Sequence, residues 1–567
     1  MTERGLPFMM IMAIAVGSVA GFGAWGFRML IGFVHNVLFL GQFVFAYDAN
    51  VHTPYSPWGI GVVLVPVAGA LVVAWLVKNF APEAKGHGVP EVMDAIYYNQ
   101  GRIRPRVAVI KSLASAVSIG SGGSVGREGP IVQIGSAFGS TLGTLIPMRT
   151  GDRVTLIAAG AGAGIAATFN APLGGIVFAI ELLLVSVNAR NLLLVTTASV
   201  LATYIGRLLL GTAPSFYLPA LEVPDFHLTQ PWELAAFALL GVLMGLVSVA
   251  FIRGLYKMED IFEAMPGNYY TRHTLGMFCV GLMMLLLSRH SGHYYVEGVG
   301  YATIMDILQG TLSDPWFLLL LAVLKLLATC LSLGSGASGG VFSPALFMGA
   351  AGGAAFGHLC QALIPGFTVA IPTFAIAGMA AAIGGSTGAV LTGIIMLTEM
   401  TKDHAIMLPL VITCSVAYAV RKGIMDESIY TMKLRARGHT VPEGLHASVL
   451  TSGRIRDVMT TDFTVVPSGG DVPPGATIVV HADKSVISGV TRPEDAQAGS
   501  DGIFLNYVVM PEQAMLLAAA IALLDSEADI ILVSRNTNSR RTEDIVGVVS
   551  PASLAHVFKV DEELSLP

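Results

Sequence analysis

The chain has 567 residues, of which 54% are hydrophobic and 12% are charged, and its mean hydropathy is +0.69. Soluble domains carry about 25% charged residues, so this composition excludes a soluble globular protein and indicates a polytopic membrane protein. The formal net charge of −6 gives no indication of a nucleic-acid partner. The four cysteines lie apart in apolar segments without metal-binding spacing, so we predict buried thiols and no disulfide framework.

The apolar segments start near the N-terminus, where residues 7–41 are predicted to form a retained first helix rather than a cleaved signal peptide. Further apolar segments of the first half are 57–77, 105–119, 131–147, 154–166, 173–187 and 191–211. After a polar connection at 213–231, those of the second half are 232–254, 272–288, 316–333, 342–363, 371–384, 388–400 and 405–420. Several are shorter than the roughly 20 residues that span a bilayer. We therefore expect short helices that enter the membrane and end inside the protein.

One stretch, Gly120 to Pro130, interrupts the apolar sequence of the first half with the residues GSGGSVGREGP. Small residues favour an irregular backbone, which is tolerated at bilayer depth only where it is buried in protein or lines a cavity. Arg127 and Glu128 then stand in apolar surroundings, where ionisable side chains are costly and usually functional. A glycine-rich turn that opens a helix also presents unpaired N–H groups to an anion. We interpret the stretch as an anion site with a carboxylate standing in it.

The same pattern returns in the second half. Gly334 to Pro344 repeats the first stretch at an offset of 214, with six of the eleven positions identical. Further on, residues 170–181 resemble residues 388–399 at an offset of 218. Two halves with interrupted hydrophobic segments are typical of transporters whose substrate site lies at the repeat interface. We predict two repeats, at about 7–211 and 232–430.

Two pentapeptides, 122–126 and 336–340, fit the GxSxG signature of serine hydrolases. That signature needs a strand before the turn, whereas helices are predicted before both copies. A membrane-embedded serine hydrolase therefore stays a distant alternative, which labelling by a serine-reactive probe would revive.

The composition changes after about residue 437. Residues 438–567 are charged, contain strand-like runs such as 476–480 and 530–533, and are long enough for one compact domain. We predict an all-α polytopic membrane domain over 1–437, followed by a small cytosolic α/β domain.

Four motifs together resemble those of the CLC family of chloride channels and chloride/proton antiporters. Residues 86–90 (GHGVP) are similar to the family's GSGIP, residues 126–130 match GREGP, and residues 340–344 (GVFSP) are similar to GxFxP. Tyr430 falls where the family's pore tyrosine follows the last membrane helix. The resemblance covers most of 1–437. It implies a homodimer in a cell membrane, such as the inner membrane, with one pore and two inverted repeats in each subunit.

Carried over residue by residue, the resemblance implies that Glu128 is the gating glutamate, whose carboxylate competes with chloride and leaves when protonated. Amides of Val341 and Phe342 would line the anion sites, and the Tyr430 hydroxyl would donate to the central anion. The other residues of the implied chloride site are His87, Gly88, Gly126, Arg127 and Gly340. Neutral donors and helix N-termini suit a halide, because they hold it without preventing its release. Chloride and, for an antiporter, protons are the expected ligands, without a cofactor or metal.

Two positions depart from the family pattern, and the first is His87. It stands where the family has a serine whose hydroxyl contacts the central anion. An imidazole donates one N–H when neutral and carries charge when protonated. The ring either donates to the central anion or points away, in which case backbone amides alone donate to it. The sequence leaves both alternatives open.

The second departure concerns the proton pathway. Family antiporters carry a proton-transfer glutamate one residue after the position of Glu181, and here that residue is Leu182, which cannot carry a proton. The predicted pathway therefore involves Glu128 and either Glu181 or water. This shifts the interpretation slightly toward a channel or a weakly coupled transporter, with stoichiometric chloride/proton antiport as the alternative.

The tail resembles a CBS domain at both ends, over residues 454–467 and 544–550, whereas its middle matches poorly. The resemblance implies a degenerate CBS pair with a regulatory role. Nucleotide binding does not follow from it, and a structural or dimer-contact role is equally open.

Overall fold

The computed structural model describes residues 5–185, 187–212, 216, 231–364, 366–367, 369–439, 441, 454–468, 477–491, 505–525, 528–536, 539–551 and 553–554. The chain divides into two compact units, residues 1–445 and 446–567, where the sequence places the change after residue 437. Most of the expected polar connection at 213–231 lies outside the described residues.

Among its described residues, the first unit contains helices but no β-strand. Its first half consists of α1 (Leu6–His35), η1 (Asn36–Leu40), η2 (Gly59–Val63), α2 (Leu64–Phe80), η3 (Pro82–Ala84), α3 (Val89–Tyr97), α4 (Pro105–Gly120), α5 (Glu128–Leu145), α6 (Thr150–Phe169), α7 (Pro172–Leu182) and α8 (Ala189–Leu210). Its second half consists of α9 (Pro231–Ala264), α10 (Tyr269–Ser291), α11 (Tyr301–Leu308), α12 (Pro315–Ser335), α13 (Phe342–Leu363), α14 (Ile371–Thr387), α15 (Val390–Thr401), α16 (Met407–Ile424) and α17 (Thr431–Arg435).

The helix ends follow residue chemistry. Pro105, Pro172 and Pro315 begin α4, α7 and α12, because proline lacks the N–H that the first helical turn leaves unpaired. Gly292 and Gly388, at φ values of 91° and 82°, end α10 and α14. This left-handed backbone suits glycine and terminates a helix.

Within the described part of the chain, eight helical segments are long and apolar enough to cross a membrane. Helices α7 and α15, with 11 and 12 residues, are too short to span one. The short apolar segments predict short helices here, and the structure contains them.

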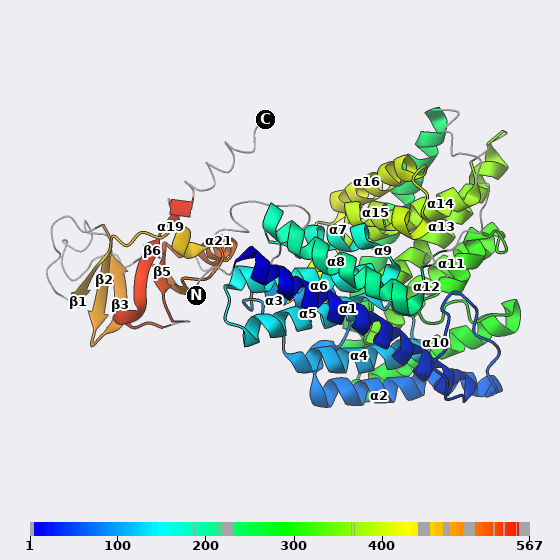
Figure 1. Ribbon diagram of the computed structural model, residues 1–567, viewed down its shortest axis with the longest axis horizontal. Coiled ribbons are helices and arrows are strands. Elements are labelled where there is room, and N and C mark those ends of the chain that lie inside the picture. Colours follow the sequence, from blue (N-terminus) through cyan, green and yellow to red (C-terminus); the bar gives the residue numbers. More distant parts are fainter. Residues whose placement is uncertain are drawn as a thin grey trace. The chain divides into compact units, whose positions relative to one another are not determined.

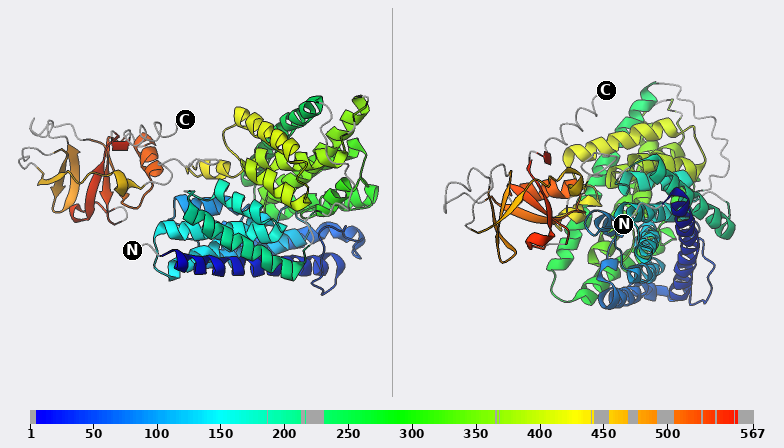
Figure 2. Two further views of the ribbon diagram at one scale, coloured as in Figure 1. Left: turned by 45° about the horizontal axis from the view of Figure 1, so that its top comes forward. Right: turned by 60° about the vertical axis from the view of Figure 1, so that its left-hand side comes forward.

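The two halves of the membrane unit lie side by side (Figures 1 and 2). In the left view of Figure 2, the blue-to-cyan half forms one layer and the green-to-yellow half the other. Each half contains a closely packed helix pair. A Cβ added at Gly135 of α5 would lie 2.1 Å from the carbonyl oxygen of Gly160 in α6, and one added at Gly349 of α13 would lie 2.3 Å from that of Gly378 in α14. Small residues thus let the backbones approach closely at equivalent places in both halves.

The two glycine-rich stretches meet between the halves. Gly126 N donates to Gly340 O over 2.7 Å, and Gly340 N donates to Gly126 O over 2.6 Å. Gly86 forms a parallel bridge with Ser338. The three glycine-containing motifs are therefore joined by backbone hydrogen bonds at one place.

The described residues of the second unit form two three-stranded sheets with the same topology. In the first, β1 (Thr464–Pro467) runs parallel to β2 (Val479–Asp483), which is antiparallel to β3 (Val486–Thr491). In the second, β4 (Tyr507–Pro511) runs parallel to β5 (Ile530–Ser534), which is antiparallel to β6 (Ile545–Val549). The other elements among the described residues of this unit are α19 (Ile455–Val458), α21 (Leu516–Asp525) and η4 (Thr542–Asp544). The unit is therefore the small α/β region that its composition predicts.

Candidate functional site

Glu128 is held by neutral hydrogen-bond donors of the second half. It is the first residue of α5, directly after the glycine-rich loop, and only 2% of its surface is exposed. Tyr301 Oη donates to Glu128 Oε1 over 2.8 Å, and Ser343 Oγ donates to the same oxygen. Ser343 N donates to Glu128 Oε2 over 3.3 Å. We call Glu128, Tyr301 and Ser343 the Glu128 site.

The position of the Glu128 carboxylate is one that an anion would occupy. Ser343 lies in the first turn of α13, whose N-cap is Val341. Amides of a first helical turn have no partner within the helix and carry the positive end of its dipole. The sequence assigns this role to the amides of Val341 and Phe342, and the structure adds Ser343, which contributes both an amide and a hydroxyl.

Tyr301 is a site residue that sequence reasoning missed. It opens α11, is 1% exposed, and its hydroxyl lies 3.0 Å from Ser343 Oγ. Tyr301 belongs to no motif and is 173 positions from Glu128. A buried tyrosine usually finds a partner for its hydroxyl, but that rule does not identify the partner.

Arg127 is turned away from the neighbouring carboxylate. The described residues contain no ion pair between Arg127 and Glu128, and Arg127 Nη2 donates weakly to Thr168 O, 3.5 Å away. The Arg127 guanidinium carbon lies 5.1 Å from the centroid of the Tyr301 ring. Arg127 and Tyr301 also line the same cavity. Glu128 is therefore held by hydrogen bonds rather than by its adjacent cation.

His87, Tyr256 and Tyr430 form a second group, the His87 cluster. The centroids of the His87 and Tyr430 rings are 6.1 Å apart, and His87 Nε2 lies 3.3 Å from Tyr256 Oη. Because Tyr256 Oη donates to Ile429 O over 2.7 Å, its oxygen is left to accept from His87 Nε2–H. His87 Nδ1 is buried and has no hydrogen-bond partner in the part of the chain that the structure describes. The ring therefore stays beside Tyr430, with one nitrogen available to a ligand.

The glycines expected at the chloride site make backbone hydrogen bonds and close backbone contacts. The amides of Gly126 and Gly340 donate to each other's carbonyls and so cannot also donate to an anion. Gly88 is the N-cap of α3, where an added Cβ would lie 2.8 Å from the carbonyl oxygen of Gly129. Glycine is therefore required at these positions by close backbone approach.

Two buried lysines fix loops of the two halves in the same way. Lys111 Nζ donates to the carbonyls of Ala84 and Gly86. Lys325 Nζ donates to two carbonyls of the loop 296–298, over 3.0 and 2.8 Å. The offset of 214 that relates the glycine-rich stretches also relates the two lysines. A charged group at this depth is costly, and the paired carbonyls supply the acceptors that make it tolerable.

Glu181 and Glu399 each close the N-terminus of a helix in the other half. Glu181 accepts from the amides of residues 391 and 392, at the start of α15, over 2.8 and 2.7 Å. Glu399 accepts from the amides of residues 173 and 174, at the start of α7, over 3.1 and 2.7 Å. Both oxygens of Glu181 are thus engaged as in a helix cap, which is a poor arrangement for a mobile proton carrier. Leu182 beside it is buried.

The GxSxG serines lack the arrangement of a hydrolase. Ser124 Oγ lies 3.1 Å from Thr329 Oγ1, and Ser338 Oγ donates to Ala84 O over 2.7 Å. Helices α4 and α12, not strands, precede the two copies. The described residues also contain no group of three or more His, Cys, Asp or Glu side chains suited to a metal ion.

Residues 69–422 match the family described as "Voltage gated chloride channel". The H(+)/Cl(−) exchange transporter ClcA of Vibrio parahaemolyticus serotype O3:K6 is 33% identical over 452 residues, which cover 76% of this chain and 90% of the relative. ClcA of Vibrio vulnificus strain YJ016 is 35% identical over 390 residues, which cover 67% and 80% of the two chains. The chain belongs to the CLC family of voltage gated chloride channels and transporters. It is an integral membrane protein and not an enzyme, which excludes the hydrolase alternative.

Solved structures show the same fold. A slow cyanobacterial Cl−/H+ antiporter matches with a TM-score of 0.65 and 27% identity, over 77% of this chain and 99% of that one. A eukaryotic CLC transporter matches with a TM-score of 0.60 and 19% identity, over 97% of both chains. The second match extends the likeness in fold through the C-terminal α/β region.

Proposed function

We propose that the protein is a chloride/proton antiporter in which the Glu128 carboxylate and chloride compete for the same donors. The observation that carries this proposal is the contact of Glu128 with the amide and hydroxyl of Ser343 at the N-terminus of α13. The relatives named above as exchangers support coupled transport. The preference for a channel, drawn from Leu182, finds no support in them, and we replace it with antiport.

The exchange follows from the charge of one side chain. An ionised carboxylate accepts strong, charge-assisted hydrogen bonds, and a protonated one accepts weaker bonds. Protonation therefore loosens Glu128 from Tyr301 and Ser343 and leaves their donors to a chloride ion. Loss of the proton returns the carboxylate, which displaces the chloride. A proton and a chloride thus alternate at one place.

His87 is our second proton-binding group. A neutral His87 uses its Nε2–H toward Tyr256, so Nδ1 presents a lone pair that would repel an anion. A proton on Nδ1 turns this nitrogen into a donor for chloride beside Tyr430. Burial holds the pKa of His87 well below its usual value, and the positive charges of Lys433, Lys111 and Arg437 lower it further. We therefore infer that the proton and the anion bind together, and that Glu181 contributes only through water.

The remaining features follow the family resemblance. We propose a homodimer with one pore in each subunit, placed in the inner cell membrane with residues 438–567 in the cytosol. The equivalence of Lys111 with Lys325 supports two inverted repeats, and the equal topology of the two sheets supports a degenerate CBS pair. We propose a regulatory role for that pair, without assigning it a nucleotide.

The test is coupled flux in sealed vesicles that contain the purified protein. An imposed chloride gradient should drive protons in the opposite direction, as measured with a pH-sensitive dye while the membrane potential is clamped. Glu128→Gln should still pass chloride but move no protons. Glu263→Gln, which changes a carboxylate with 60% of its side chain exposed, is the matched control. Chloride flux by the wild type without proton movement would contradict antiport and restore the channel interpretation.

A further inference from the structure

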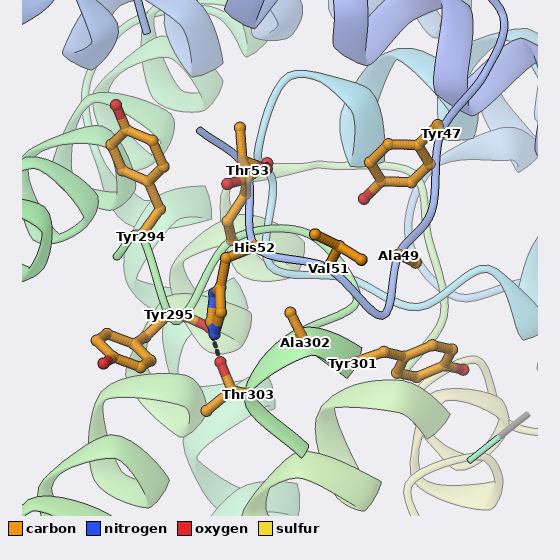
Figure 3. Close-up of a pocket in the computed structure, with 12 residues that line it drawn as sticks. Tyr47, Ala49, Val51, His52, Thr53, Tyr294, Tyr295, Tyr301, Ala302 and Thr303 are labelled. Atoms are coloured by element: carbon orange, nitrogen blue, oxygen red, sulfur yellow. Dashed lines mark hydrogen bonds between the residues drawn. The ribbon is translucent and has the colours of Figure 1, made fainter. Parts of the chain in front are cut away.

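A cavity of about 200 Å³ lies next to the Glu128 site. Tyr301 joins the two, because it lines this cavity while its hydroxyl donates to Glu128. A smaller cavity of about 30 Å³ borders Tyr301 as well, and Figure 3 shows it between the segment that carries Tyr47 to Thr53 and the segment that carries Tyr294 to Thr303. The smaller cavity has no arginine in its described lining, whereas the larger one has several.

The described lining of the larger cavity is strongly basic. It contains Arg28 of α1, Arg127 before α5 and Arg207 of α8, and the one carboxylate among the lining residues is that of Asp48. Three positive charges and one negative charge leave a formal charge of +2 around the space. We call this cavity the arginine pocket. Its charge equals that needed to neutralise a divalent anion.

Arg127 has a buried donor beside the arginine pocket that no described residue accepts from. Only 8% of this residue is exposed, and its Nε has no hydrogen-bond partner among the residues that the structure describes. A buried charged N–H without an acceptor is destabilising, so native proteins rarely leave one unpaired. Because the side chain lines the cavity, an anion held there can supply this acceptor.

The geometry of the pocket favours an oxyanion over a halide. Arg207 Nε donates to Asn170 Oδ1 over 2.6 Å, which orients the guanidinium and uses one of its five N–H groups. Guanidinium groups match the paired oxygens of sulfate or phosphate with two parallel hydrogen bonds. The cavity volume of about 200 Å³ also exceeds the roughly 30 Å³ that a water molecule occupies in the liquid, and chloride is of comparable size to water.

We propose that the arginine pocket binds a divalent tetrahedral oxyanion of the sulfate or phosphate class beside the Glu128 site. A bound oxyanion engages Arg127 and places negative charge next to Tyr301. Chloride is then repelled from this approach to Glu128, so occupation lowers chloride flux. The binding itself does not depend on the proposed transport function, whereas the effect on flux rests on it.

The same oxyanion chemistry has two sources, a free ion and the phosphate of a lipid. Trp25 and Tyr204, 38% and 59% exposed, lie three residues before Arg28 and Arg207 on the same helices. Exposed aromatic residues near helix ends are typical of the membrane–water interface, where lipid headgroups lie. The experiment therefore has to separate the two sources.

Binding is measured first, as the thermal unfolding midpoint of the full-length protein in detergent with sulfate replacing isethionate at constant ionic strength. Sulfate should raise the midpoint of the wild type and of Arg289→Gln, which removes a positive charge from α10 outside the pocket. The double variant Arg28→Gln/Arg207→Gln should need about tenfold more sulfate, or more, for each guanidinium lost. Equal responses of all three proteins, no response of the wild type, or the same response to chloride would overturn the proposal.

Two further measurements identify the bound anion and test the pocket independently of the proposed antiport function. In vesicles, external sulfate should lower chloride efflux of the wild type relative to its own rate in isethionate, and should not lower that of the double variant. If no variant passes chloride but sulfate still stabilises only proteins with an intact pocket, the pocket stands and the proposed function fails. Short-chain phosphatidic acid, whose phosphate monoester can carry two negative charges, assigns the site to lipid phosphate if it suppresses the sulfate response. A sulfate response unaffected by this lipid assigns the site to the free anion.

Discussion

The hydroxyl of Tyr301 lies 2.8 Å from Glu128 Oε1, so a neutral donor of the second half holds a carboxylate of the first. The Tyr301 ring lies near the Arg127 guanidinium, and the centroid of the Phe216 ring is 5.3 Å from its own. The hydrogen bonds from neutral donors to a carboxylate weaken when the carboxylate gains one proton. A carboxylate held by an ion pair would have to give up a whole charge interaction, so this arrangement suits a gate that opens by protonation.

Tyr301→Phe should weaken the closed position of Glu128. A hydrogen bond to a charged group contributes about 1.5–3 kcal/mol, so its loss lowers the equilibrium constant for the closed position by roughly 10- to 150-fold. Chloride flux in vesicles should rise and should extend to higher pH, because less protonation is then needed to release the carboxylate. Tyr295→Phe is the matched control, since its hydroxyl donates to Ser291 O. A Tyr301→Phe pH profile that coincides with the wild type would remove Tyr301 from the gate.

Ser343→Ala should act in the same direction as Tyr301→Phe, because both hydroxyls donate to Glu128 Oε1. The backbone amide of residue 343 remains, so the carboxylate keeps one donor. We expect the two substitutions to be non-additive, since contacting residues of one hydrogen-bond network couple by about 0.5–3 kcal/mol. The measurement is a double-mutant cycle on the pH dependence of chloride flux. Strict additivity would show that the two hydroxyls act on separate steps.

His87→Ser should flatten the pH dependence of chloride affinity at the His87 cluster. A protonated ring donates to the anion and a neutral one does not, so chloride should bind more tightly at acid pH when His87 is present. The test is calorimetric chloride binding in a Glu128→Gln background, where the gating carboxylate no longer titrates. Tyr256→Phe is informative as well, because it frees the ring from its Nε2 partner and should weaken the pH dependence. If chloride affinity in the Glu128→Gln protein does not change with pH, the ring takes no part.

Glu181→Gln should lower stability rather than abolish proton transport. The amide keeps the shape of the side chain but loses the charge that stabilises the first turn of α15, which we expect to cost about 0.5–2 kcal/mol. Glu399→Gln should have the same effect on α7, with Glu263→Gln as the control. The readouts are the unfolding midpoint in detergent and the chloride-driven proton flux. Unchanged stability together with lost proton movement would make Glu181 the proton carrier after all.

Much of the membrane unit could be predicted from local patterns. The repeat offset of 214 located Gly126 and Gly340, which the structure joins by two hydrogen bonds. The apolar run lengths also predicted that α7 and α15 would be too short to span. These features depend on composition and spacing along the chain, which a sequence displays directly.

The partners of Glu128 could not be predicted, because they depend on how distant segments meet. Ser343 stands in a recognised motif, but nothing in that motif aims its hydroxyl at Glu128. Tyr301 follows a loop of mixed composition and resembles any buried aromatic residue. The hydrogen bonds of Glu181 could not be predicted for a similar reason. The sequence shows a carboxylate near a known relay position, whereas the amides that occupy it come from residues 391 and 392.

The mutual closure of α7 by Glu399 and of α15 by Glu181 has a consequence for biogenesis. When the ribosome has delivered only the first half to the bilayer, the amides at the start of α7 lack the carboxylate of Glu399 as their acceptor. The carboxylate of Glu181 likewise lacks its donors, the amides of residues 391 and 392. Hydrocarbon offers no substitute for either. The nascent first half is therefore an incomplete folding unit that must wait for its counterpart. Two halves synthesised as separate polypeptides should accumulate together and be degraded alone.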